Sequence, residues 1–178
     1  MKLSHLCLFL LTISATYSAY FNTPTLAMME AHLADPVWDG QKIPEGQQCS
    51  RYGGDGATPK LVINGVPNET DEIAVAFNDE SFPLMNNGGH GVIGFAIGNE
   101  RPVILHPVPG ETNDLPKGVR SIEPHRATNP VYSPGTAYLP PCSGAMGNIY
   151  SVTISALEHT TGGRAHLLDQ IKIPLGRY

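Results

Sequence analysis

The clearest hydrophobic pattern in the chain is an alternation near its C-terminal end. From Asn148 onward the even positions are mostly apolar and the odd positions carry hydroxyl groups, as in Tyr150-Ser151-Val152-Thr153-Ile154-Ser155-Ala156. A period of two residues is typical of a β-strand with one buried face. The preceding residues, 138–147, are rich in proline and glycine, which disfavour a helix or a central strand. The pattern therefore predicts a shaped loop that leads into a half-buried strand.

Four further segments have the pattern of strands. Residues 72–77 are apolar at both alternating sets of positions, which is typical of a central strand with two buried faces. The short apolar runs 61–63 and 103–106 and the alternation in 90–97 predict three more strands. The chain is therefore expected to be mainly β.

The other segments are expected to be loops and short helices. Residues 101–136 contain seven prolines and, apart from 103–106, no strand pattern. A long segment of this kind inside a compact domain is usually functional or a well-packed surface loop. Short helices are expected at 26–33 and at 164–171, the second from an apolar stripe of Ala165, Leu168 and Ile171.

Length, composition and charge narrow the class of protein. With 178 residues, the chain is long enough for one domain with a sizeable core and too short for two comfortable ones. Its 16 prolines and 19 glycines, against 15% charged residues, indicate a turn-rich globular protein. The formal net charge is −5 and the basic residues are not clustered. Nucleic acids and anionic membrane surfaces attract concentrated positive charge, so we expect no nucleic-acid partner.

Residues 1–19 have the pattern of a secretory signal peptide. Lys2 lies in a short n-region, residues 6–13 form an apolar h-region, and small residues follow near a plausible cleavage site. The apolar run is too short to span a bilayer, and a buried N-terminal strand or helix is the alternative. We therefore expect a secreted or periplasmic protein with no transmembrane segment, in which residues 20–178 form a single domain.

Removal of the signal peptide would leave two cysteines. Cys7 would be lost, and Cys49 and Cys142 would remain. An even number of cysteines in an exported protein favours a single disulfide between them. Two separate buried thiols are the alternative interpretation.

The stretch 138–157 resembles a known family signature. The signature is Gly-Pro-Cys-Pro-Pro-Ser-Gly-x-His-Arg-Tyr-x-Phe-x-x-Tyr-Ala-Leu, of the phosphatidylethanolamine-binding protein family in the bacterial and archaeal branch often called Raf-kinase-inhibitor-like. Without a gap, Pro141-Cys142 falls on its Pro-Cys, Tyr150 on its Tyr and Ala156-Leu157 on its Ala-Leu. The resemblance implies an antiparallel β-sandwich with a few short helices and long proline-rich loops.

The same resemblance bears on the cysteines and on one pair of residues that does not match. Cysteines occur in the resembling branch at the places of Cys49 and Cys142, which supports their pairing. The His-Arg pair of the signature is replaced by Asn148 and Ile149. An asparagine can form hydrogen bonds but cannot become a cation, and isoleucine has no guanidinium. We therefore expect weaker and less pH-dependent anion binding than the full signature implies.

The resemblance also implies where a ligand site lies. Asp79 follows the strand 72–77 and falls on the first Asp of the family's Asp-Pro-Asp, whereas Ser81 replaces the second. His90 occupies the place of the family's pocket histidine. A turn-forming aspartate and a structural histidine are the alternatives for these two residues. The predicted pocket, a degenerate site for a small anionic or zwitterionic ligand such as phosphate or a phospholipid head group, is formed by Asp79, His90, Asn148 and Tyr150.

No pattern for covalent catalysis or for a cofactor stands out. The chain has no Gly-x-Ser-x-Gly, no phosphate-binding glycine loop and no His-Glu-x-x-His, so we expect no enzyme, no cofactor and no metal site. A hydrolase that uses Ser81, Ser143 and His90 is an alternative without recognisable spacing. A second alternative is a protein-interaction or inhibitor module that acts through the loop 101–136, and the family resemblance allows a protease or kinase as its target. His125-Arg126 in this loop repeats the missing pair, and we interpret it as a coincidence.

Overall fold

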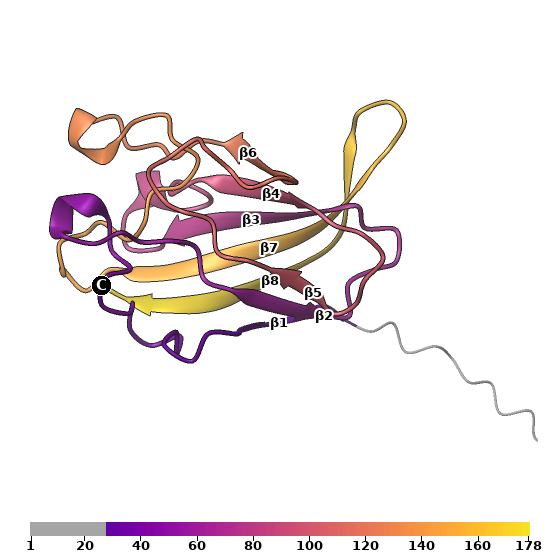
Figure 1. Ribbon diagram of the computed structural model, residues 1–178, viewed down its shortest axis with the longest axis horizontal. Helices are drawn as coiled ribbons and strands as arrows, with labels where there is room; N and C mark the ends of the chain where they lie inside the picture. Colours follow the sequence, from indigo (N-terminus) through magenta and orange to yellow (C-terminus); the bar gives the residue numbers. More distant parts are fainter. Residues whose placement is uncertain (1–27) are drawn as a thin grey trace, which may run out of the picture.

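The computed structural model describes residues 28–178, and the predicted signal peptide, 1–19, lies outside the described residues. The described chain forms two antiparallel sheets that enclose one hydrophobic core (Figure 1). The strands are β1 (Glu30–Leu33), β2 (Leu61–Asn64), β3 (Glu72–Asp79), β4 (Val92–Ala96), β5 (Val103–Leu105), β6 (Val119–Glu123), β7 (Ile149–His159) and β8 (Ala165–Arg177). The smaller sheet has the order β1-β2-β5 and the larger has the order β6-β4-β3-β7-β8. The prediction of a mainly β, antiparallel fold is confirmed.

Strand β3 lies at the centre of the larger sheet, between β4 and β7. Its side chains are buried on both faces, and Ile73, Val75 and Phe77 pack into the core between the sheets. The strand predicted over 72–77 is present and continues to Asp79, which pairs with Tyr150 of β7. This register places the polar end of β3 beside the first residues of β7.

Strands β7 and β8 form the longest hairpin, and its turn projects at the end of the molecule opposite the C-terminus (Figure 1). The predicted alternation of β7 is confirmed, since the side chains of Val152, Ile154 and Ala156 are fully buried. The helix expected at 164–171 is wrong, because β8 pairs with β7 over its whole length. A free edge of β7 offers a complete ladder of backbone partners, and this tertiary pairing overrides a short apolar stripe.

Two other expectations need correction. The described part of the segment 26–33 contains strand β1 rather than a helix, because residues 30–33 pair with β2. The segment 101–136 contains a second strand, β6, which pairs with β4 at the edge of the larger sheet. Strand β6 is mostly exposed or half-buried, so it carries little of the hydrophobic alternation from which a strand can be recognised.

Short 3₁₀ helices interrupt three of the loops. They are η1 (Ser50–Tyr52), η2 (Pro83–Met85) and η3 (Pro130–Tyr132). Helices η1 and η3 lie at the end of the molecule where the C-terminus is found (Figure 1). Within residues 28–178, no helix is both long enough and apolar enough to cross a membrane.

Candidate functional site

A cavity of about 530 Å³ lies where β3 ends and β7 begins. Residues of all three 3₁₀ helices contribute to its wall, together with the loops before β4 and β7. Its buried part contains the side chains of Asp79, His90 and Tyr150, and its outer part contains Phe82, Leu84 and Met146, which are exposed. The four residues that the sequence analysis assigned to a pocket all line this cavity, with Asn148 as the fourth.

Asp79 is the last residue of β3 and one of the most buried polar residues, with 4% of its surface exposed. Its Oδ1 accepts a hydrogen bond from the backbone N–H of Ser81 at 2.9 Å. Its Oδ2 accepts a hydrogen bond from the side-chain amide of Asn148 at 2.6 Å. One oxygen of Asp79 thus stabilises the turn and the other faces Asn148. The turn-forming interpretation and the site-forming one are therefore compatible.

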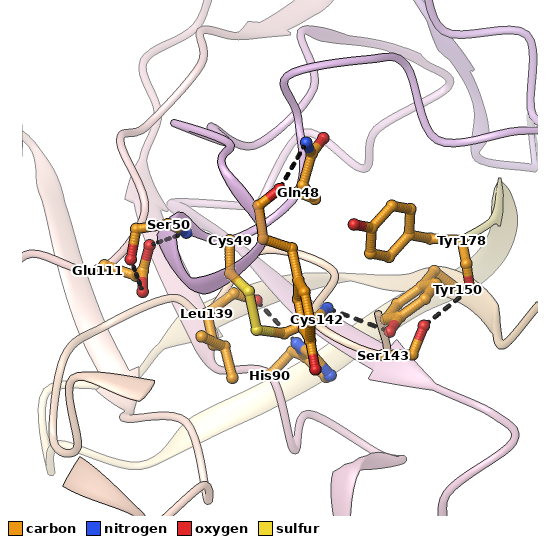
Figure 2. Close-up of a disulfide and its surroundings, with 11 residues drawn as sticks. Gln48, Cys49, Ser50, His90, Glu111, Leu139, Cys142, Ser143, Tyr150 and Tyr178 are labelled. Atoms are coloured by element: carbon orange, nitrogen blue, oxygen red, sulfur yellow. Dashed lines mark hydrogen bonds between the residues drawn. A yellow bond between two sulfur atoms is a disulfide. The ribbon is translucent and has the colours of Figure 1, made fainter. Parts of the chain in front are cut away.

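His90 precedes β4 and is 4% exposed. Its Nδ1 lies 2.7 Å from the carbonyl oxygen of Leu139 (Figure 2). A carbonyl can only accept, so Nδ1 carries the proton and Nε2 of the neutral ring is an acceptor. Burial lowers the pKa of the imidazole from 6.5 to about 4, against smaller opposing effects that include the Leu139 carbonyl. His90 is therefore neutral at pH 7.

Gly91 brings the segment of Leu139 close to His90. Its φ is +114°, and a Cβ at this position would lie 2.0 Å from the carbonyl oxygen of Ala137. Any side chain would push the segment 137–139 away. Gly91 thus permits the backbone contact that fixes the tautomer of His90.

Tyr150 packs its ring edge-on against His90, with 5.4 Å between the ring centroids. Its hydroxyl oxygen accepts a hydrogen bond from the backbone N–H of Cys142 at 3.2 Å. Burial raises the pKa of the phenol to about 12, so the hydroxyl keeps its proton and can donate it to a ligand.

A disulfide between Cys49 and Cys142 holds the loop before β7 against η1 (Figure 2). The pairing predicted from the cysteine count is confirmed, and the two Cα atoms lie 5.3 Å apart. Next to it, the hydroxyl of Ser143 donates to the backbone carbonyl of Tyr178 at 2.7 Å. The N–H and hydroxyl of Ser50 both donate to the carboxylate of Glu111. These contacts fix the cavity wall from several directions.

The sequence analysis missed the residues that form the outer wall. Arg126 lines the cavity, although the His125-Arg126 pair was interpreted as a coincidence. Its guanidinium donates to the backbone carbonyls of Asn86 and Asn87 and lies 3.3 Å from Glu123. Ile149, which replaces the arginine of the signature, is not part of the lining. No pattern in the sequence shows that the loop carrying Arg126 folds over the pocket.

Two tyrosines form part of the outer wall. Tyr52 of η1 and Tyr132 of η3 line the cavity, and the guanidinium of Arg51 lies 5.6 and 5.5 Å from their ring centroids. A cation over two aromatic faces is a favourable arrangement, and it connects two short helices from distant parts of the chain. Among residues 28–178, no three His, Cys, Asp or Glu side chains are placed to hold a metal ion.

Comparison with known proteins shows a distant structural similarity. No protein-family model matches the sequence, and no curated protein matches it. The chain is similar to a crystal structure from Chlamydia trachomatis that is described as a phosphatidylethanolamine-binding protein homolog. The match has a TM-score of 0.49 and 18% sequence identity, and it covers 85% of this chain and 97% of that chain. The family is the one that the signature in 138–157 resembles. Because a match at this level says nothing about a ligand, the site is interpreted from its own geometry.

Proposed function

We propose that the protein is an exported binding protein that takes a small zwitterionic molecule into the cavity at the ends of β3 and β7. The observation that carries the proposal is the convergence of two distant parts of the sequence, one with Asp79 and His90 and the other with Asn148 and Tyr150, on one cavity of about 530 Å³. This volume lies in the range of small-molecule sites, which are mostly apolar with a few convergent polar groups.

The contacts around the cavity support a preformed site. The disulfide, the hydrogen bond from Cys142 to Tyr150 and the hydrogen bond from Asn148 to Asp79 hold three of the wall segments in place. A site that is already ordered loses less conformational entropy when a ligand binds. The same disulfide, together with the predicted signal peptide, supports export, because disulfides persist in oxidising compartments.

A binding role is favoured over a catalytic one by the partners of the serines. The hydroxyl of Ser143 donates to a backbone carbonyl, and that of Ser81 accepts a hydrogen bond from the backbone N–H of Ile149. In the described chain, no hydrogen bond joins a serine hydroxyl to an imidazole. Activation of a serine requires such a base, so the hydrolase interpretation has no support in the geometry.

A free anion is not the ligand that this cavity fits best. Asn148 uses its amide on Asp79, and the guanidinium of Arg126 donates to two backbone carbonyls and faces Glu123. Among the residues that the structure describes, the lining therefore offers an anion no uncommitted cation, and we expect inorganic phosphate to bind weakly.

The interaction or inhibitor module stays an alternative prediction. Strands β5 and β6 pair within the two sheets, and residues 126–129 and Tyr132 line the cavity. Much of the loop 101–136 is thus already used inside the molecule, which favours the ligand-binding proposal.

Titration of the isotope-labelled protein with phosphoethanolamine tests the proposal. We expect saturable amide shifts at residues that line the cavity, and loss of the saturable shifts in Met146→Trp, which fills the exposed mouth. Leu167→Trp is the matched control, because Leu167 is also exposed but lies on β8 far from the cavity. Shifts that never saturate, or that are the same in both variants, would contradict the proposal.

A further inference from the structure

Exposed apolar side chains gather around the mouth of the cavity. The structure describes ten large apolar residues that are exposed, and four of them line this one cavity. They are Tyr52 at 39%, Phe82 at 51%, Leu84 at 57% and Met146 at 80% exposure. Val131 and Ile149, also exposed, are the sequence neighbours of two further lining residues, Tyr132 and Asn148. We call these six exposed residues the apolar rim, and an apolar patch of this kind marks an interaction surface.

The loop that carries Met146 is fixed in the position that exposes it. The hydroxyl of Ser143 donates to the backbone carbonyl of Tyr178 at 2.7 Å (Figure 2), and the N–H of Gly147 donates to the same oxygen at 2.8 Å. Between these two bonds, Ala145 has a φ of +60°, a left-handed conformation that alanine rarely adopts. Because the loop is closed at both ends, the methionine stays turned toward solvent beside the cavity.

The segment that carries Phe82 and Leu84 has little freedom either. Pro83 fixes the backbone between them at the start of η2, and the buried side chain of Met85 anchors the end of the same helix. An apolar surface that is ordered before its partner arrives loses little conformational entropy on binding. The apolar rim is therefore a preformed surface.

The shape of the apolar rim is self-complementary. Met146 projects from it, and the cavity of about 530 Å³ opens beside Met146 on the same face. When two copies meet about a twofold axis between these two features, each projecting side chain faces the cavity of the other copy. A second copy of the chain thus supplies both the projection and the hollow by symmetry.

We infer that the apolar rim is the interface of a homodimer, in which Met146 of each copy enters the cavity mouth of the other and packs beside Leu84. The inference goes beyond the proposed function, because it completes the cavity with a residue of a second copy. A ligand then enters or leaves only when the dimer opens.

The area of the apolar rim is sufficient for a dimer of moderate affinity. At about 200 Å² for a large side chain, the exposed fractions of its six residues correspond to roughly 600 Å² per copy. Two copies would bury roughly 1,200 Å², which is the lower end of the range for specific interfaces. We therefore expect a Kd on the order of micromolar.

The charges at the mouth favour a second copy over a lipid surface. In the described chain, Arg126 is the single lysine or arginine of the lining, and its guanidinium lies 3.3 Å from the carboxylate of Glu123. The formal net charge is −5. Proteins that lie on membrane surfaces combine an apolar face with several basic residues, which this face does not have.

Sedimentation velocity on the intact protein without ligand tests the inference. From about 1 µM to 1 mM at pH 7.4, we expect the mass to rise from that of one chain to that of two. Met146→Asp should raise the dimer Kd by about thirtyfold, as for the loss of a central interface residue. Leu167→Asp is the matched control, because Leu167 is 50% exposed on β8, and it should leave the Kd unchanged. A monomer at every concentration, or equal effects of the two variants, would overturn the inference.

A mixing experiment tests the reciprocal contact itself. Met146→Lys and Leu84→Glu should each weaken the homodimer, because each places a charge in an apolar contact. In their heterodimer, the introduced lysine faces the introduced glutamate and the second contact is unchanged. Labelled Met146→Lys should therefore bind unlabelled Leu84→Glu about tenfold more tightly than it binds unlabelled Leu167→Glu. Equal affinities would show that Met146 does not meet Leu84 of the partner subunit.

The outcomes also separate this inference from the proposed function. If the protein dimerises and the phosphoethanolamine titration does not saturate, the dimer stands and the ligand-binding proposal fails. If the titration saturates on a protein that stays monomeric, the reverse holds. Vesicles of phosphatidylcholine give the remaining outcome. Co-sedimentation of a monomeric protein that Met146→Asp abolishes would assign the apolar rim to a bilayer and overturn the dimer.

Discussion

Strand β3 buries a carboxylate at each end, and the two have opposite surroundings. Glu72, at the start of the strand, is 5% exposed and accepts two hydrogen bonds from the guanidinium of Arg120, at 2.6 and 2.7 Å. His159 Nε2 lies 3.4 Å from it. Asp79, at the other end, is 4% exposed, and within residues 28–178 it accepts side-chain hydrogen bonds only from the N–H of Ser81 and the amide of Asn148.

The difference separates a structural carboxylate from a candidate functional one. Glu72 has its cation within the fold. Gly94 leaves the space for the Glu72 carboxylate, since a Cβ at position 94 would lie 2.2 Å from its Oε1. Asp79 has a cavity beside it in place of a cation. The two carboxylates are equally buried but unequally compensated, which makes Asp79 the candidate functional one of the two.

The largest expected effect concerns the covalent link at the cavity end. Replacing Cys49 and Cys142 together by serine should lower the free energy of unfolding by about 4 kcal/mol, because 93 residues separate the cysteines and their loop gains freedom in the unfolded state. Urea denaturation measures the change. The cavity end should also lose protection from hydrogen exchange before the β7–β8 turn does, and the reverse order would contradict the assignment of the disulfide to that end.

The second effect is the pH dependence that His90 gives to the cavity end. The unfolded imidazole binds a proton below pH 6.5, whereas burial keeps the folded imidazole neutral until about pH 4. Stability is therefore fully present above pH 6.5 and falls by roughly 3 kcal/mol as the pH drops to about 4. Comparison of denaturation curves for the wild type and His90→Gln should show that this component is missing in the variant. Parallel pH profiles would contradict the prediction.

The third effect tests the compensated end. Arg120→Met keeps the aliphatic stem but leaves the carboxylate of Glu72 without its main partner, so the free energy of unfolding should fall by about 2 kcal/mol. The value is reduced from that of a fully buried pair because the Arg120 side chain is 55% exposed. Ligand binding at the far cavity should not change. A variant as stable as the wild type would show that the pair does not compensate Glu72.

The smallest effect has the opposite sign. Asp79→Asn removes an uncompensated buried charge and keeps an oxygen for the N–H of Ser81, so the free energy of unfolding should rise by about 1 kcal/mol at pH 7. Glu72→Gln, the same substitution at the other end of β3, should be destabilising because it breaks the pair with Arg120. If both variants are destabilised alike, the two carboxylates do not differ in the way described.

Much of the fold was predictable because its signals are local. The alternation of β7 and the apolar residues on both faces of β3 are patterns within a few consecutive residues. Both strands were therefore placed correctly from the sequence. Strands β1, β6 and β8 were missed or assigned as helix, because each exists through backbone pairing with a neighbour in its sheet. Edge strands carry little alternation, so a short apolar stripe in Arg164–Ile171 could equally indicate a helix.

The sequence by itself determined the mainly β fold, the pair Cys49 and Cys142, and, through a family resemblance, the residues Asp79, His90, Asn148 and Tyr150 as site candidates. Only the tertiary structure decided how these residues are used. It placed the Asn148 amide on Asp79, fixed the tautomer of His90 with the Leu139 carbonyl, and brought Arg126 to the mouth. The physical reason is that charge compensation depends on distances between segments that no local pattern encodes. These distances paired Glu72 with Arg120 and left Asp79 beside the cavity without a cation.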